Sequence, residues 1–175
     1  MTAEVKHTTL ADLDFVFEMF EQSILYQEKK GYVVWRDYDR QAIVRDIELK
    51  QHYKIEIDNK IAIAFSVAYS DKIIWRNYDT GNAIYLHRIV VNPEFKGQKL
   101  FGNILDWAIG HAHKKNLTAV RMDTWANNPT IQQYYRQFGF QVVENFITPD
   151  SPELPQHNRK LAITLLEYPL NKNSN

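Results

Sequence analysis

Residues 84–102 read IYLHRIVVNPEFKGQKLFG, and they predict a strand, a basic turn that contains a glycine, and the start of a helix. The apolar run at 84–91 is typical of a buried strand, and apolar residues recur at helical spacing over 100–115. Strand character returns at 118–123. A strand, helix and strand of these lengths indicate a right-handed crossover, which makes the two strands parallel neighbours in one sheet.

The residues before this stretch predict a strand, two helices and a β-hairpin. The strand is expected at 4–8, and the first helix runs from the capping-box-like pair Thr9 and Asp12 to Lys29-Lys30-Gly31. Asp39 caps the second helix. The hairpin covers 55–69 and has a tight turn at Asp58-Asn59-Lys60.

The residues after it predict one more helix and two strands. Pro129 begins a short amphipathic helix that ends at Gly139, and strands at 140–145 and 160–167 flank a proline-punctuated loop. The expected fold class is α/β (α+β): a single domain over 1–170 with a mixed, partly parallel central sheet flanked by helices. A frayed tail is expected at 171–175.

The composition excludes several kinds of protein. The 175 residues contain no cysteine, so disulfides, thiolate metal sites and a cysteine nucleophile are excluded. The 21 basic residues balance 21 acidic ones, which gives no general attraction to nucleic acid or to anionic membranes. No apolar run approaches the roughly 18 residues that span a bilayer, and the N-terminus lacks a leader pattern. We therefore expect a cytoplasmic protein with no nucleic-acid or membrane partner.

The turn at 92–102 has the chemistry of a phosphate site. Amides at a helix N-terminus are unpaired donors, the helix dipole favours an anion, and Gly97 can adopt backbone angles that point N–H groups inward. Lys96 and Lys99 add positive charge. The alternative is that Gly97 is an ordinary turn residue and the two lysines form a solvated rim.

The residues around the turn match a known pattern. The pattern begins with Val91-Asn92-Pro93-Glu94-Phe95-Lys96-Gly97 and an apolar helix, and continues with Asn128, Tyr135 and Phe138-Gly139-Phe140. This order resembles the GCN5-related N-acetyltransferase (GNAT) superfamily, and the resemblance is close over 84–146. The family's phosphate turn usually reads Arg or Gln, two residues, Gly, one residue, then Gly or Ala. This chain has Lys96, Lys99 and Phe101 at those three places.

The resemblance implies that the chain binds acetyl-CoA and transfers the acetyl group directly to a primary amine. The backbone of 89–91 would bind the pantetheine arm and the amides of 97–102 the pyrophosphate. The residues expected at acetyl-CoA are Ile89, Val90, Val91, Lys96, Gly97, Gln98, Lys99, Leu100, Phe101, Gly102, Asn128 and Tyr135. Two alternatives stay open: a CoA-binding module without transfer activity, and a nucleotide-binding α/β protein that uses the same turn.

Direct attack requires a base, because an alkylamine with a pKa of about 10.4 is mostly protonated at pH 7. Tyr85 and His87 lie two apart in the predicted strand and face the same side. By resemblance, Tyr85 lies near the place where some relatives have a catalytic glutamate. His87 is the better candidate, because its usual pKa of about 6.5 lies near working pH. The alternative for His87 is a structural hydrogen bond inside the sheet.

Tyr135 matches a tyrosine that commonly protonates the leaving thiolate in relatives. Proton transfer from a phenol to a thiol is uphill by roughly 2 kcal/mol at their usual pKa values. Helical spacing alone favours a core position beside Tyr134, whereas the family spacing favours the acid. Asn128 is well placed as the N-cap before Pro129, and in relatives it touches CoA.

The acceptor is expected to be a small-molecule or peptide amine. Candidates for its pocket are Trp35, Trp75, Tyr78, Asp123 and Trp125. The alternative for the aromatic residues is packing under a loop or at a sheet edge, and for Asp123 an exposed loop carboxylate. Relatives are often dimers, which implies that a homodimer is possible.

No metal is expected. His111 and His113 are the residues that suggest one, but positions i and i+2 on a helix point about 200° apart and cannot chelate one ion.

Overall fold

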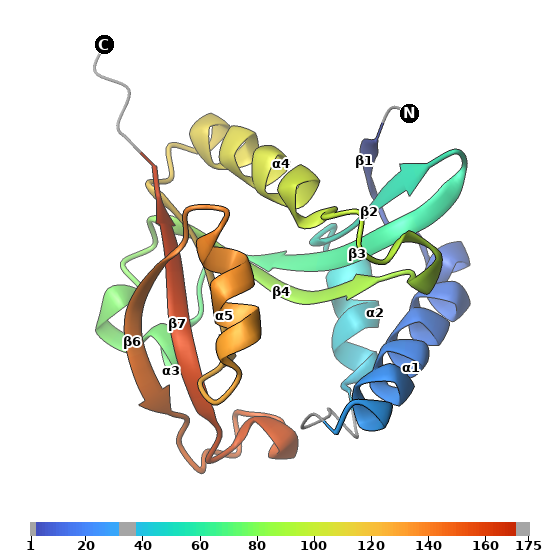
Figure 1. Cartoon of the computed structure of the whole chain (residues 1–175). Helices are drawn as coiled ribbons and strands as arrows, with labels where there is room; N and C mark the ends of the chain where they lie inside the picture. Colours follow the sequence, from blue (N-terminus) through green and yellow to red (C-terminus); the bar gives the residue numbers. More distant parts are fainter. Residues whose placement is uncertain (1–2, 32–37, 171–175) are drawn as a thin grey trace. The chain divides into compact units, whose positions relative to one another are not determined.

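The computed structural model describes residues 3–31 and 38–170. Its seven strands form one mixed sheet flanked by helices, in the order β1-β2-β3-β4-β5-β7-β6, and β4 and β5 are parallel (Figure 1). This confirms the predicted α/β fold class with a mixed, partly parallel sheet flanked by helices. Trp35 and the predicted tail lie outside the described residues. Within them, no helix combines the length and the apolar character that crossing a membrane requires.

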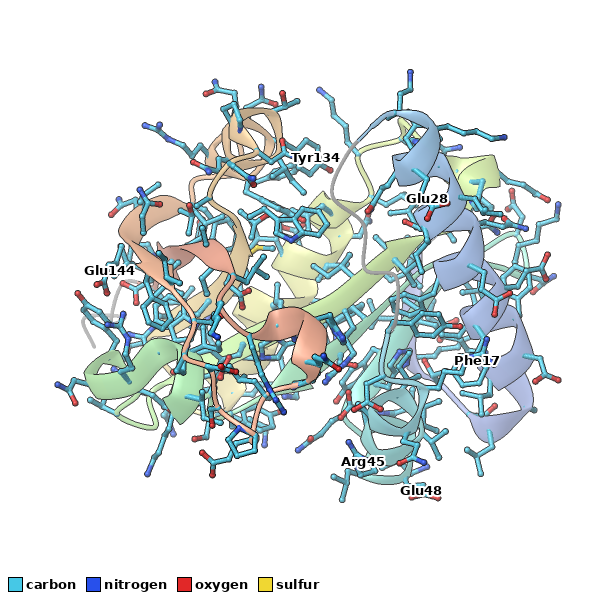
Figure 2. All side chains as sticks on the ribbon, turned by 90° about the horizontal axis from the view of Figure 1, so that it is seen from below. Phe17, Glu28, Arg45, Glu48, Tyr134 and Glu144 are labelled. Carbon is cyan, nitrogen blue, oxygen red and sulfur yellow. The ribbon has the colours of Figure 1, made fainter. Side chains whose placement is uncertain are left out.

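The chain divides into two compact units, Met1–Val67 with His87–Asn103 and Ala68–Leu86 with Ile104–Asn175. The first unit contains β1 (Glu4–His7), α1 (Leu13–Lys29), α2 (Arg40–Glu48), β2 (His52–Ile57) and most of β3 (Lys60–Ala68). Strand β1 pairs antiparallel with β2, and β2 with β3. Figure 2 labels Phe17 on α1 and Arg45 on α2. The core of this unit joins apolar side chains from both helices and two strands: Val16, Met19, Phe20, Ile43, Ile47, Ala64 and Val90.

The helix ends of this unit agree with the predicted signals. The amide of Thr9 donates to Asp12 Oδ2 at 2.8 Å, which is half of a capping box. Asp39 Oδ1 accepts from the amide of Ala42 at 3.0 Å and caps α2. Gly31 ends α1 with a φ of +70°, a left-handed conformation that glycine adopts without strain.

The hairpin between β2 and β3 is also confirmed. Asp58 and Asn59 have φ values of +51° and +62°, the combination that a type I′ turn requires. Lys60 then pairs with Ile57 as the first residue of β3. The polar turn therefore fixes the register of the strands that carry the core residues.

The second unit contains α3 (Lys72–Trp75), the first part of β4 (Ala83–Val91), most of α4 (Phe101–Lys114), β5 (Ala119–Trp125), α5 (Pro129–Arg136), β6 (Gln141–Ile147) and β7 (Ala162–Pro169). Strand β4 pairs in parallel with β5 through residues 83–85, which confirms the predicted crossover. Strand β5 pairs antiparallel with β7, and β7 with β6. Helix α3 was not predicted, because four residues are too few for a periodic signal.

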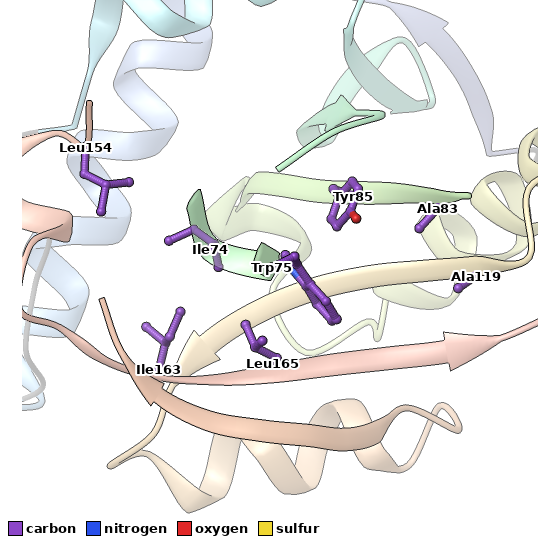
Figure 3. Close-up of a cluster of buried hydrophobic side chains, with 8 residues drawn as sticks. All are labelled: Ile74, Trp75, Ala83, Tyr85, Ala119, Leu154, Ile163 and Leu165. Carbon is purple, nitrogen blue, oxygen red and sulfur yellow. The ribbon is translucent and has the colours of Figure 1, made fainter. Parts of the chain in front are cut away.

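The core of the second unit contains two large aromatic side chains, Trp75 and Tyr85, among aliphatic ones (Figure 3). Its members are Ile74, Trp75, Ala83, Tyr85, Ala119, Leu154, Ile163 and Leu165. Outside this cluster, His111 on α4 forms a 2.7 Å hydrogen bond between its Nε2 and the hydroxyl of Tyr69 and stacks on Trp107. His111 is therefore part of a local aromatic contact of α4.

Candidate functional site

The segment that joins β4 to α4, residues 92–102, is called the carrier loop, and it lies in the first unit. Asn92 attaches its start to β3. The side-chain Nδ2 of Asn92 donates to the carbonyl of Ile61 at 2.8 Å, and its amide donates to the carbonyl of Ala62 at 2.9 Å. Its Oδ1 accepts from the amide of Glu94 at 3.0 Å. Asn92 is 5% exposed, so these bonds are protected from water and fix where the loop begins.

The backbone of the carrier loop is left-handed at two residues. Gly97 has a φ of +84° and Lys99 a φ of +54°. Lys99 stands where the GNAT turn usually has its first glycine. The chain therefore keeps the conformation that a glycine would adopt and accepts a strain of roughly 1–2 kcal/mol at a lysine. Lys99 thus has a backbone conformation that a glycine would adopt without strain.

The carrier loop offers unpaired N–H donors. Among residues 3–31 and 38–170, the amides of Gly97, Lys99 and Leu100 have no hydrogen-bond acceptor. By contrast, the amide of Gln98 donates to the carbonyl of Phe95, and that of Gly102 to the carbonyl of Lys99. Three unpaired amides directly before α4, with two exposed lysines beside them, are the donor set that a phosphate group requires.

Strand β4 changes conformation just before the carrier loop. Arg88 has a φ of +51° inside β4, where strand residues normally have negative φ. Its Nη1 donates to Asp46 Oδ2 on α2 at 2.9 Å. Val90 beyond it packs in the core of the first unit, while Val91 is exposed. The left-handed residue therefore interrupts the regular strand conformation directly before residues 89–91, the segment predicted to bind the pantetheine arm.

His87 does not have the proton affinity that the sequence predicts. Burial, with a smaller effect from the charge of Arg88, lowers the pKa of His87 from its ordinary value to about 4. A histidine with this pKa is neutral at pH 7 but is a weak base. The expectation that the pKa of His87 lies near working pH is therefore wrong, because the protein around the ring disfavours its charged form.

Tyr85 lies in the core of the second unit (Figure 3). Its side chain is fully buried, and its hydroxyl accepts from Arg121 Nη1 at 3.0 Å. Burial raises the pKa of Tyr85 to about 12. A phenol with this pKa is a poor base near neutral pH, so Tyr85 is not suited to take a proton from an ammonium group.

Trp75 is likewise a core residue, with no exposed surface. The guanidinium of Arg121 lies 4.7 Å from the centre of its ring, and Arg121 Nε donates to Glu167 Oε2 at 2.7 Å. This placement agrees with the alternative in which Trp75 shields the sheet. Tyr78 is exposed, packs edge-on against Trp75 at 6.4 Å, and accepts from Arg121 Nη1 through its carbonyl.

Helix α5 begins as predicted. Asn128 Oδ1 accepts from the amide of Ile131 at 3.1 Å, which confirms the N-cap before Pro129. Tyr135 is half-buried and packs against Tyr134, at 5.3 Å between ring centres, and against Phe140. Figure 2 labels Tyr134 on the same helix. Burial first, and then the nearby Tyr134 and Asp123, raise the pKa of Tyr135 well above its ordinary value, so its hydroxyl keeps its proton at neutral pH.

Asp123 does not match the alternative of an exposed loop carboxylate. It is a half-buried residue of β5, the strand that α5 contacts, and its charge adds to the effects that raise the pKa of Tyr135. Burial raises the pKa of Asp123 to about 6. Trp125, the last residue of β5, is also half-buried, and its carbonyl accepts from Gln132 Nε2 on α5. Sequence reasoning missed the basicity of Asp123, because burial depends on residues distant in the chain.

The fold and the carrier loop define a class of protein, and the acetyltransferase (GNAT) family profile matches residues 13–140. The chain belongs to this family. It is 32% identical over 73 residues to the uncharacterized N-acetyltransferase YesJ of Bacillus subtilis (strain 168), over 42% of this chain and 41% of YesJ. The chain thus aligns with less than half of the length of this curated relative.

Solved structures share the fold. A GNAT-family acetyltransferase from Listeria monocytogenes 4b F2365 is 20% identical with a TM-score of 0.75, and the match covers 96% of this chain and 95% of that one. The putative acetyltransferase YncA from Salmonella typhimurium, solved with acetyl-CoA, is 16% identical with a TM-score of 0.67, covering 100% and 98%. At these identities the similarity shows the fold alone.

Proposed function

We propose that the chain is an acetyl-CoA-dependent N-acetyltransferase that acts on a primary amine of a small molecule or peptide. The observation that supports this most is the carrier loop, where the unpaired amides of Gly97, Lys99 and Leu100 precede α4 in a chain of the GNAT family. These amides would hold the pyrophosphate of CoA, with Lys96 and Lys99 as point charges. The backbone of 89–91 would hold the pantetheine arm.

The chemistry of this proposal needs one base and one acid. The amine nitrogen attacks the thioester carbonyl, a C–N bond forms, the C–S bond breaks, and the sulfur leaves with the bonding electron pair. The acceptor ammonium must first lose a proton to the base. As the tetrahedral intermediate collapses, the same nitrogen loses another proton and the leaving thiolate gains one. Tyr135, protonated at neutral pH, would supply the proton to the sulfur, and the proton released from the nitrogen would restore the Tyr135 hydroxyl through solvent.

We assign the base to Asp123 rather than to His87. Both groups are mainly deprotonated at pH 7, since their pKa values are about 6 and about 4. The group with the higher pKa is the stronger base, by roughly a factor of 100 in proton affinity for two pKa units. Strand β5, which carries Asp123, also contacts α5, which carries Tyr135, so the proton acceptor and the proton donor would belong to neighbouring elements of the second unit.

The test is thiol release from acetyl-CoA across a panel of amines, measured together with CoA binding. We expect amine-dependent thiol release from the wild-type chain. Tyr135→Phe should lower turnover at least about tenfold and leave the Kd for CoA nearly unchanged, because the phenylalanine keeps the ring packing. Tyr134→Phe, on the adjacent ring, is the matched control and should retain turnover.

Other outcomes would indicate other functions. Binding of CoA without thiol release for any amine would indicate a CoA-binding module. Binding of ATP or NAD but not of CoA would indicate a nucleotide-binding protein. Unchanged turnover in Tyr135→Phe would leave Tyr135 a packing residue.

A further inference from the structure

An exposed tyrosine on α1 contacts the carrier loop. Tyr26 lies near the C-terminal end of α1, the helix on which Figure 2 labels Glu28, and is 43% exposed. The ammonium of Lys96, the residue before Gly97, lies over the face of the Tyr26 ring. Helix α1 also contacts the turn Pro93–Phe95 that precedes Lys96. All of these residues belong to the first unit, so the contact is internal to it.

The electrostatics of Tyr26 agree with this contact. The hydrogen bond and charge of Lys96 lower the pKa of the Tyr26 phenol, and the charge of Lys30 adds to the effect. The Nζ of Lys30 lies 5.9 Å from the centre of the same ring. The ring of Tyr26 thus lies near two ammonium groups of the first unit, that of Lys30 at the end of α1 and that of Lys96 in the carrier loop.

The two lysines of the carrier loop are held differently. Lys96 is exposed to solvent, and its ammonium rests on Tyr26. Lys99 is exposed as well, and within residues 3–31 and 38–170 its side chain has no hydrogen bond or ion pair. A free lysine loses side-chain entropy when a ligand fixes it. Lys96 has lost part of this freedom before any ligand binds, because the ring already restrains it.

We propose that Tyr26 is a positioning residue for the carrier loop, which holds the Lys96 ammonium next to the unpaired amides in readiness for the diphosphate of CoA. The inference rests on the proposed function and deepens it, because it assigns α1 a part in binding the phosphates. Tyr26 acts through Lys96 and not by touching the reacting atoms.

The strength of the contact sets the expected effect. The attraction of a cation to an exposed aromatic face corresponds to about a two- to fivefold change in affinity. Tyr26→Ala should therefore weaken CoA binding about two- to fivefold. Tyr26→Phe keeps the ring face and should stay within about twofold of the wild type. Tyr26 is partly exposed, so neither change should lower the thermal stability appreciably.

The experiment is calorimetric titration of CoA into the full chain and its variants. The wild type, Tyr26→Ala, Lys96→Ala and the double variant form a cycle, to which Tyr26→Phe is added. Phe15→Ala is the control, because Phe15 is a similarly exposed aromatic residue of α1. We expect Tyr26→Ala to have no further effect in the Lys96→Ala background. Pantetheine, which lacks the diphosphate, should bind the wild type and Tyr26→Ala equally.

Three results would overturn the inference: equal affinity of the wild type and Tyr26→Ala for CoA, an equal effect of Tyr26→Ala with and without Lys96, or the same weakening by Phe15→Ala. Failure of the proposed function gives a different result, because the wild type itself would then show no binding of CoA.

Discussion

Gly97→Ala and Gly110→Ala add the same methyl group, and we expect them to change the free energy of unfolding in opposite directions. At both positions the new methyl would find open space, with no heavy atom within 4 Å. The positions differ in backbone conformation: Gly97 is left-handed with a φ of +84°, whereas Gly110 lies within α4. The comparison therefore isolates the conformation of the carrier loop from any steric clash.

The magnitudes depend on the backbone. A left-handed conformation costs alanine about 1–2 kcal/mol. Alanine also lowers the conformational entropy of the unfolded chain, which offsets about 0.4–1 kcal/mol of this cost. Gly97→Ala should thus destabilise the protein by about 1 kcal/mol. In an exposed helix, replacing glycine with alanine stabilises by about 0.5–1 kcal/mol. For a chain of this size, about 1 kcal/mol corresponds to about 2–4 °C in Tm, so the two variants should differ by about 3–8 °C.

Thermal unfolding monitored by circular dichroism measures this difference, and titration with CoA measures its effect on the site. We expect the Tm of Gly97→Ala to fall, that of Gly110→Ala to rise, and CoA affinity to fall only in Gly97→Ala. A Tm for Gly97→Ala above that of the wild type would refute the left-handed geometry at this residue, and with it the donor set of the carrier loop.

Three further predictions concern buried groups. Burial lowers the pKa of His52 to about 4. The stability that the neutral ring contributes is therefore fully present above about pH 6.5 and falls by up to about 3 kcal/mol as the pH drops to about 4. In urea unfolding, the free energy of unfolding of His52→Asn should decrease less over that pH range than that of the wild type. Asn92→Ala should lower the free energy of unfolding by about 1–3 kcal/mol and weaken CoA binding, because it removes a buried hydrogen-bonding side chain. Glu94→Ala, at an exposed position of the same loop, should change neither quantity. Urea unfolding measures the first quantity, and titration with CoA the second. The acidic limb of kcat/KM should lie near pH 6 and disappear in Asp123→Asn, and a limb near pH 4 would instead favour His87.

Local signals allowed most of the fold to be predicted. The tight turn at Asp58-Asn59-Lys60, the cap at Asp39 and the start of α5 at Asn128-Pro129 depend on neighbours within a few residues, and all three are confirmed. The parallel pairing of β4 with β5 was predictable from segment lengths and the handedness of crossovers.

The parts that could not be predicted depend on contacts between distant residues. Arg121 binds the hydroxyl of Tyr85, 36 residues away in the chain, and this contact places Tyr85 in the core. The shifted pKa values of His87 and Asp123 arise from burial, which a strand pattern does not reveal. The left-handed φ of Lys99 was not predicted, because lysine rarely adopts this conformation, although the family pattern has a glycine at this position.

The role of the carrier loop is tested most directly by titrating the ¹⁵N-labelled chain with CoA and recording its backbone amide resonances. We predict that the largest shifts occur at Gly97, Lys99 and Leu100, whose amides have no acceptor within the described residues. The amides of Gln98 and Gly102, which already donate within the loop, should shift less. Saturable binding with no shifts in the carrier loop, or no binding of CoA at all, would contradict the assignment of this loop to the phosphates of CoA.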